Sequence, residues 1–159
     1  MILLDKNRIE RTLNRMAFQI LEEAHSQPFR LIGVNHRGFA IAQIIKRILE
    51  KESGSKISLS NLHSDNGETV TLKEIKKDEV LFIIDDVIFS GGSMFRIIQK
   101  IENLSSFENV IVAVLVDRGH RKYPILAGIV GFDVPTKLNE QVTLHVEDDQ
   151  PMQVLLTNK

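Results

Sequence analysis

The sequence predicts an α/β protein with a central parallel sheet flanked by helices and a small C-terminal region rich in strands. Runs of apolar, mostly β-branched residues alternate with segments whose apolar residues recur every three or four positions. Such runs are typical of buried strands and such segments of amphipathic helices, and their alternation favours parallel strands joined by right-handed crossovers. Beyond residue 126 the short apolar runs follow one another without a helical pattern.

Three helices and several strands follow from these patterns. Asp5 can cap a first helix that ends before Pro28, and its apolar face carries Ile9, Leu13, Met16, Ile20 and Ala24. The other two helical faces carry Ala40, Ile41, Ile44, Ile45, Ile48 and Leu49, and then Met94, Ile97, Ile98 and Ile101. Strands are expected at 29–34, 57–62, 80–84 and 110–116, and shorter ones at 127–132, 141–146 and 154–157.

No repeat or linker divides the chain, so residues 1–159 are expected to form a single domain. The most polar stretch, residues 63–79, is the one place for a flexible loop. The 20 Lys and Arg residues nearly balance the 21 Asp and Glu residues, and the net charge of −1 gives no global attraction to nucleic acid or to a membrane surface. The absence of cysteine fits a reducing compartment, and the early charges of the N-terminus do not fit a signal peptide, so cytoplasm is the expected location.

Polar residues follow three of the predicted strands, where open parallel sheets bind ligands. The three stretches are NHRG (35–38), DDVIFSGGS (85–93) and DRGHR (117–121), and they are expected to share one crevice. In the second, Gly91–Gly92 permits a tight turn, and Ser90 and Ser93 supply hydroxyl groups. The free N–H groups of the following helix complete a cradle of phosphate size.

Asp85 and Asp86 precede this cradle as hydrogen-bond acceptors, so the ligand should carry sugar hydroxyls or hydrated Mg²⁺ beside its phosphate. The alternative is that both acids are turn residues and that the glycines serve tight packing. The dinucleotide and Walker-type phosphate motifs do not match. A phosphorylated sugar fits the stretch better than either nucleotide class.

The sequence VLFIIDDVIFSGGS resembles the phosphoribosyl-pyrophosphate (PRPP) binding motif of type I phosphoribosyltransferases. The stretch AVLVDRGHRKYPILAGIVGFDVPTKLNEQV is similar to the C-terminal half of the bifunctional pyrimidine-operon regulator and uracil phosphoribosyltransferase family, and LIGVNHRGFAIA resembles its first turn. The resemblance implies the type I phosphoribosyltransferase fold, a homodimer, and transfer of phosphoribose from PRPP to a nucleobase, with uracil as the best guess.

The resemblance also implies roles for individual residues. Asp85 and Asp86 would hold the ribose hydroxyls, and they form the catalytic set together with Arg37, which would stabilise the leaving pyrophosphate. The PRPP-binding residues implied are His36, Arg37, Gly38, Asp85, Asp86, Val87, Ser90, Gly91, Gly92 and Ser93. Arg118, Gly119 and His120 would lie near the base. Mg²⁺ would be bound mainly by PRPP oxygens, and any direct protein ligand would be Asp85 or Asp86.

Two departures from the family pattern support a rival function. Phe89 stands where some members have an acid or a tyrosine, which excludes a general base there, and residues 63–79 are shorter than the family's catalytic hood. The rival is a non-catalytic regulator that senses PRPP or a nucleotide, and a third option is a scaffold for an unrelated sugar phosphate. RNA binding by Arg8, Arg11 and Arg15 is weighed against a solvated helix face, which the neutral total charge favours.

Overall fold

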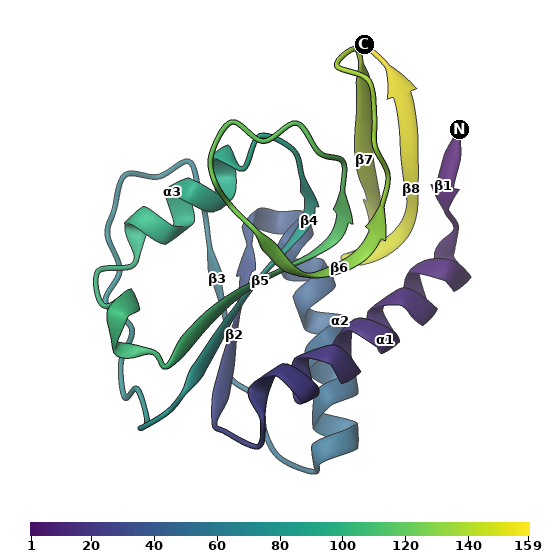
Figure 1. The fold of residues 1–159 in the computed structure, drawn as a ribbon. Helices are drawn as coiled ribbons and strands as arrows, with labels where there is room; N and C mark the ends of the chain where they lie inside the picture. Colours follow the sequence, from purple (N-terminus) through teal and green to yellow (C-terminus); the bar gives the residue numbers. More distant parts are fainter.

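The computed structural model describes residues 1–159 and contains two sheets (Figure 1). A five-stranded parallel sheet has the order β3-β2-β4-β5-β6, and a three-stranded antiparallel sheet has the order β1-β8-β7. The strands are β1 (Ile2–Leu4), β2 (Phe29–Val34), β3 (Leu59–Leu62), β4 (Val80–Ile88), β5 (Asn109–Asp117), β6 (Ala127–Asp133), β7 (Glu140–Glu147) and β8 (Gln150–Asn158). The helices are α1 (Lys6–Ala24), α2 (Asn35–Ser53), α3 (Gly92–Lys100) and a short 3-10 turn, η1 (Leu104–Ser106). The predicted fold class is confirmed.

Helices cover both faces of the parallel sheet, α1 and α2 on one face and α3 on the other (Figure 1). The residues of β4 divide between the two faces with a period of two, as a strand requires. Phe82 and Ile84 pack with the apolar residues of α1 and α2, whereas Leu81 and Ile83 pack with those of α3. Burial on both faces explains why these strands read as continuous apolar runs.

The strand order changes direction between β2 and β4. From β2 the chain passes through α2 to β3 at one edge of the sheet, and then returns past β2 to place β4 on its other side. The carboxyl ends of β2 and β4 therefore border a topological switch point, which is where open α/β sheets leave a crevice for a ligand.

The predictions made from the sequence differ from the structure mainly at the ends of helices and strands. β4 continues beyond the predicted end at residue 84 to Ile88, because its pairing with β5 continues to Asp117. Asp85 and Asp86 are therefore strand residues rather than turn residues. The NHRG stretch, predicted as a turn between strand and helix, is the first turn of α2.

The antiparallel sheet joins the two ends of the chain. Its strand β1 was not predicted, since three residues are too few to display a period. The backbone of Met1 exchanges hydrogen bonds of 2.8 and 2.9 Å with that of Leu156 in β8. β7 and β8 form a hairpin whose exposed turn contains Asp148 and Asp149.

The segment predicted as a flexible loop, residues 63–79, contacts the end of α3. Val70 forms an isolated bridge with Ile101, and Asn103 donates to the Leu72 carbonyl at 2.7 Å. Thr69 and Thr71 both donate to Glu102, and their hydrogen bonds lower the pKa of its carboxyl. None of the helices has the length and apolar character that crossing a membrane requires.

Candidate functional site

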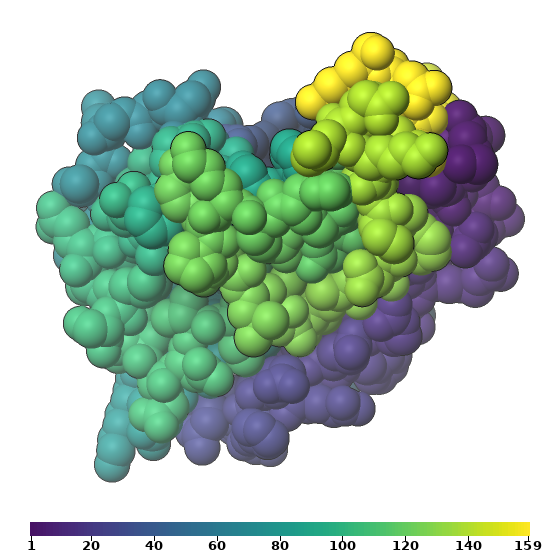
Figure 2. All heavy atoms as spheres, turned by 45° about the horizontal axis from the view of Figure 1, so that its top comes forward, coloured from purple at the N-terminus to yellow at the C-terminus, as the bar shows by residue number.

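A hollow of about 440 Å³ lies at the carboxyl ends of β2 and β4. Figure 2 shows a recess here, between the teal segments and the yellow C-terminal strand. The lining residues are Asn35, His36, Arg37, Asp85, Asp86, Val87 and Ser93. Two of the three polar stretches selected from the sequence are thus brought together, at the switch point of the sheet.

Two helices begin at this hollow, and neither N-cap residue makes a side-chain hydrogen bond to its helix, although Ser90 Oγ accepts the N–H of Gly92 at the start of α3. α1 offers the contrast, since Asp5 accepts the Arg8 N–H at 2.8 Å. At α2 and α3 the residue before the helix makes no such bond, and neither first turn contains an acid. Free N–H groups and the positive end of the helix dipole attract anions. Two such ends at one hollow fit a ligand with two separate anionic groups.

The two acids at the end of β4 differ in burial. Asp85 is 7% exposed and its Oδ1 accepts the Asp86 N–H at 2.8 Å, while Asp86 is half-buried. Burial raises the pKa of the Asp85 carboxyl well above its ordinary value, and the nearby charge of Asp86 raises it further. When ionised, the pair presents strong acceptors to the hollow, and when Asp85 keeps its proton it can also donate a hydrogen bond. Both forms suit a ligand that carries hydroxyl groups.

Gly38 brings the start of α2 against the end of β4. A methyl group on Gly38 would lie 2.9 Å from the Ile84 carbonyl oxygen and 3.0 Å from Asp85 Oδ1. Both distances are shorter than ordinary contacts, so a side chain here would push the two elements apart. This close approach is what allows His36 and Arg37 to line the same hollow as the acids.

The turn at 89–93 is held by its own residues and by residues 121–123. Gly91 has φ +83°, a left-handed conformation that costs a side-chain-bearing residue about 1–2 kcal/mol. Ser90 Oγ accepts the Gly92 N–H at 3.2 Å, and the Ser90 carbonyl accepts the N–H groups of Lys122 and Tyr123 at 2.9 and 3.0 Å. The predicted cradle is therefore a defined turn at the start of α3.

The third polar stretch contacts Phe89 and does not line the hollow. Arg118 is 4% exposed, donating to Thr136 Oγ1 at 2.9 Å and to the Glu140 carbonyl at 2.6 Å. Its guanidinium carbon lies 4.0 Å from the centre of the Phe89 ring, a cation–π contact. Burial lowers the pKa of Arg118, although Glu140 opposes the shift. His120 lies 5.8 Å from the same ring, between ring centres.

Sequence analysis did not identify the ion pair between Asp117 and Arg121. Arg121 donates to both carboxylate oxygens of Asp117, at 2.9 and 2.7 Å, and to the Phe89 carbonyl at 3.0 Å. Although burial opposes the shift, these hydrogen bonds and one from the Gly119 N–H lower the pKa of Asp117. The opposite charges within DRGHR were the available signal. Through Arg121, the third polar stretch is bonded to Phe89 at the start of the turn at 89–93.

Asn35 is a second omission. It lines the hollow and has φ +54°, a conformation uncommon outside glycine but tolerated by Asn. An Asn directly after a buried strand, before a helix without a cap, was the signal that sequence analysis could have used.

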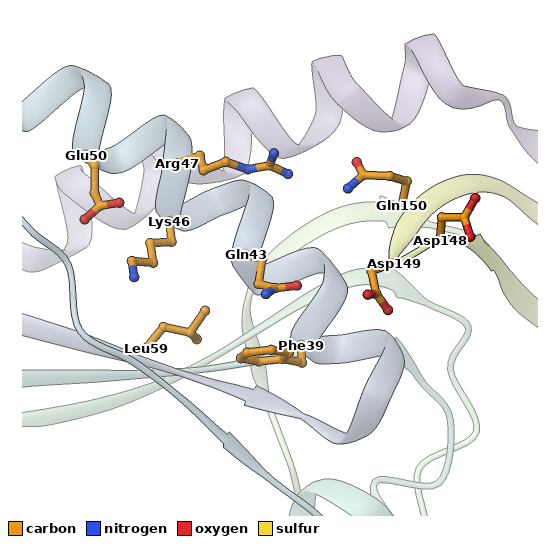
Figure 3. Close-up of a pocket in the computed structure, with 9 residues that line it drawn as sticks. All are labelled: Phe39, Gln43, Lys46, Arg47, Glu50, Leu59, Asp148, Asp149 and Gln150. Atoms are coloured by element: carbon orange, nitrogen blue, oxygen red, sulfur yellow. The ribbon is translucent and has the colours of Figure 1, made fainter.

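A larger hollow, about 510 Å³, lies along α2 on the side of the β7–β8 turn (Figure 3). Lys46 and Arg47 lie on the helix side, and Asp148 and Asp149 on the turn side. This hollow lacks a helix N-terminus and the carboxyl end of a parallel strand, so size alone does not make it the better candidate. Asp149 Oδ1 also lies 3.7 Å from His36 Nε2, a contact between two exposed side chains at the edge of the smaller hollow.

No group of three or more His, Cys, Asp or Glu residues is arranged to hold a metal ion. The two carboxylates at the end of β4 fit Mg²⁺ in the way that this ion binds with phosphate ligands. Mg²⁺ keeps several waters and takes one or two protein carboxylates, with the remaining ligands supplied by phosphate oxygens.

The fold and the hollow define an α/β protein with an acidic pair and two helix N-termini at the switch point of its parallel sheet. Residues 2–147 match the phosphoribosyl transferase domain, and the chain belongs to this family. It is similar to the bifunctional protein PyrR of Clostridium acetobutylicum, with 35% identity over 91% of this chain and 89% of that protein. The bifunctional protein PyrR of Nostoc punctiforme is 31% identical over 92% of this chain and 89% of its own.

Solved structures support the fold independently. A hypoxanthine phosphoribosyltransferase of Trypanosoma cruzi superposes with a TM-score of 0.75, at 15% identity, over 99% of this chain and 95% of its own. A hypoxanthine-guanine phosphoribosyltransferase of Bacillus anthracis gives a TM-score of 0.72, at 17% identity, over 99% and 97%. At such identities the likeness concerns the fold alone.

Proposed function

We propose that the protein transfers the phosphoribosyl group of PRPP to a nucleobase, with uracil as the preferred candidate, and releases pyrophosphate. One observation carries the proposal: the acids Asp85 and Asp86 share a hollow with the uncapped N-termini of two helices. PRPP has an anionic group at each end of a sugar with two free hydroxyls. Its chemistry matches two anion sites separated by an acceptor pair.

Each part of the hollow receives a role in this proposal. Asp85 and Asp86 accept hydrogen bonds from the ribose hydroxyls. The turn from Ser90 to Ser93 binds the 5-phosphate with backbone N–H groups and hydroxyls. His36 and Arg37 bind the pyrophosphate, with Gly38 allowing their approach. Mg²⁺, if carried in on PRPP, would supply positive charge to the pyrophosphate oxygens beside Asp85 or Asp86.

In the reaction, the bond from the anomeric carbon to pyrophosphate breaks and a bond to a base nitrogen forms, while the base loses a proton. Arg37 neutralises charge that develops on the leaving oxygens, and the acids orient the ribose. Phe89 cannot take a proton, so the base proton passes to solvent or to the pyrophosphate. Catalysis in this scheme rests on positioning and charge neutralisation.

The choice of uracil rests on the resemblance to the pyrimidine-operon regulator family and on similarity to proteins named PyrR. The structural neighbours act on hypoxanthine or guanine according to their names. Arg118, Gly119 and His120 remain the residues proposed to lie near the base. Because Arg118 is buried and its Nε and Nη2 bond Thr136 and Glu140, we propose that the backbone of this stretch contacts the base.

The test is pyrophosphate release from PRPP and Mg²⁺ with uracil, hypoxanthine, guanine, adenine or orotate supplied separately, beside a reaction without base. Release that depends on uracil is the expected result. Release with a purine only would replace the proposed acceptor, and no release above the base-free reaction would contradict the transferase.

A second candidate function is a PRPP- or nucleotide-sensing regulator without turnover. The segment 63–79, where the family has its hood, is bonded to the end of α3, which favours a fixed segment over a closing lid. The similar proteins are named bifunctional, and we propose RNA as the partner of such a regulator. PRPP binding without pyrophosphate release would support this candidate.

We also propose that the protein is a homodimer and that it is located in the cytoplasm. Sedimentation measures the oligomeric state.

A further inference from the structure

The residues that hold Asn35 lie outside the hollow, in β3 and just after it. Asn35 Nδ2 donates to Ser64 Oγ at 3.0 Å, and Asn35 Oδ1 accepts the Ser64 N–H at 2.9 Å. Asn61 Nδ2 donates to the carbonyls of Gly33 and Asn35, each at 2.9 Å. The path from β2 into α2 is therefore fixed by hydrogen bonds from a different part of the chain.

Lys100, the last residue of α3, holds the same segment from the other side. It is 7% exposed, and its Nζ donates to the His63 carbonyl at 2.6 Å and to the side chain of Asn66. The ion pairs of the chain involve other cations, so this ammonium is buried without a carboxylate partner. Burying a charge is costly unless its donors are used. The contact with residues 63–66 is what Lys100 provides.

Helix α3 therefore relates two parts of the site. Its N-terminus forms the turn with Ser93 at the hollow, and its C-terminus carries Lys100. Nine helical residues span about 13 Å and form a stiff unit. Lys100 bonds residues 63 and 66, and Ser64 between them bonds Asn35, so this segment connects the helix to the turn at 35–38, the second anion site.

We propose that Asn61, Ser64 and Lys100 are positioning residues that set the turn at 35–38 relative to the turn at 89–93. Below, these three residues are called the brace. The inference rests on the proposed function, because the spacing matters only for a ligand that reaches both turns. Asn61 and Ser64 contact Asn35, Lys100 bonds the neighbouring residues 63 and 66, and none of the three brace residues lines the hollow itself. The brace should therefore affect the pyrophosphate end of PRPP and spare the 5-phosphate end.

The experiment compares the binding of PRPP, pyrophosphate and ribose 5-phosphate by titration calorimetry, in the presence of Mg²⁺. Asn61→Ala and Lys100→Met should each weaken binding of PRPP and pyrophosphate about tenfold, as expected for one or two lost hydrogen bonds that hold a binding group. Ribose 5-phosphate should bind as before. Ser64→Ala, which keeps the Ser64 N–H, offers a milder change should either variant unfold.

Thr69→Val is the matched control, because Thr69 belongs to the same segment and bonds Glu102 but has no contact with Asn35. It should leave all three affinities unchanged. Equal weakening of PRPP and ribose 5-phosphate in the brace variants, or no weakening at all, overturns the inference and leaves the proposed function standing. Failure of the unaltered protein to bind PRPP overturns both. If catalysis is present, the KM for PRPP should rise more than kcat falls.

Discussion

The two turns that face the hollow hold similar positions but are built differently. Each follows a parallel strand and opens a helix that lacks a side-chain cap. At 89–93 the chain reverses through Gly91, and the side chain of Ser90 accepts the Gly92 N–H. At 35–38 the reversal falls on Asn35, and its partners are 26 and 29 residues away.

The difference shows that the left-handed conformation at 89–93 is encoded locally by a glycine, whereas that at 35–38 depends on tertiary contacts. Residues 121–123 also bond the turn at 89–93, but Gly91 adopts its left-handed conformation without help from them. Asn35 carries a side chain into that region, so its conformation depends on the residues that bond it. The two ends of PRPP should therefore respond to different mutations, and the predictions below use this separation.

The largest effect is expected where the two sites meet, at the acids of β4. Replacing Asp85 and Asp86 together with Asn removes both charged acceptors for the ribose hydroxyls. Hydrogen bonds to charged groups contribute about 1.5–3 kcal/mol each, so PRPP affinity should fall at least about a hundredfold. Calorimetry measures the affinity, and circular dichroism checks the fold. Undiminished PRPP affinity would contradict the assignment of the acids.

Replacement of Asp85 alone by Asn is expected to stabilise the fold. The pKa of Asp85 is raised by burial, so the folded state binds its proton more tightly than the unfolded chain does. Stability therefore falls as pH rises from the ordinary value of 3.8 towards the raised pKa. Asp85→Asn removes this loss, and its advantage in Tm over the unaltered protein should grow with pH across that window. An advantage that shrinks as pH rises would mean that the buried carboxyl is not the cause.

The next effect concerns the glycine of each turn. Gly38→Ala forces a methyl against the Ile84 carbonyl and should cost about 1–3 kcal/mol of stability, as overpacking does. It should also weaken PRPP about tenfold, because a displaced turn no longer positions its binding groups. Ribose 5-phosphate should weaken less, because only the contact of the methyl group with Asp85 affects it. Gly91→Ala, at φ +83°, should weaken both ligands. Binding titrations with the two ligands distinguish these patterns.

Gly54 supplies the control for backbone strain. It has φ +69° at the end of α2, and no other atom lies within 4 Å of the position that an added methyl group would take. Gly54→Ala should lower stability by about 1–2 kcal/mol through its backbone conformation alone and change neither affinity. If Gly38→Ala reduces both affinities alike, the two turns are not separable and the comparison fails.

The same separation explains how much the sequence could predict. The parallel sheet, the helices and the SGGS turn were readable because periodicity and turn glycines are local signals. The position of Asn35 was not, because its conformation depends on Asn61 and Ser64. The sequence could not show that Arg118 is buried and bonds Thr136 and Glu140, because these partners reach it only after β6 and β7 assemble. A dense cluster of charges in the sequence indicates that these groups form polar contacts. Only the folded structure shows which partners they contact.

The smallest effect is expected at the hydroxyl of the local turn. Ser90→Ala removes the acceptor of the Gly92 N–H, a contact of 3.2 Å, and leaves the shape set by Gly91 in place. The loss should be about 1 kcal/mol, or about fivefold in affinity. Because Ser90 belongs to the 5-phosphate end, PRPP and ribose 5-phosphate should weaken by the same factor, while pyrophosphate binding stays unchanged. This pattern is the reverse of that expected for Gly38→Ala and for the brace, and weakened pyrophosphate binding in Ser90→Ala would show that the turns act as one unit.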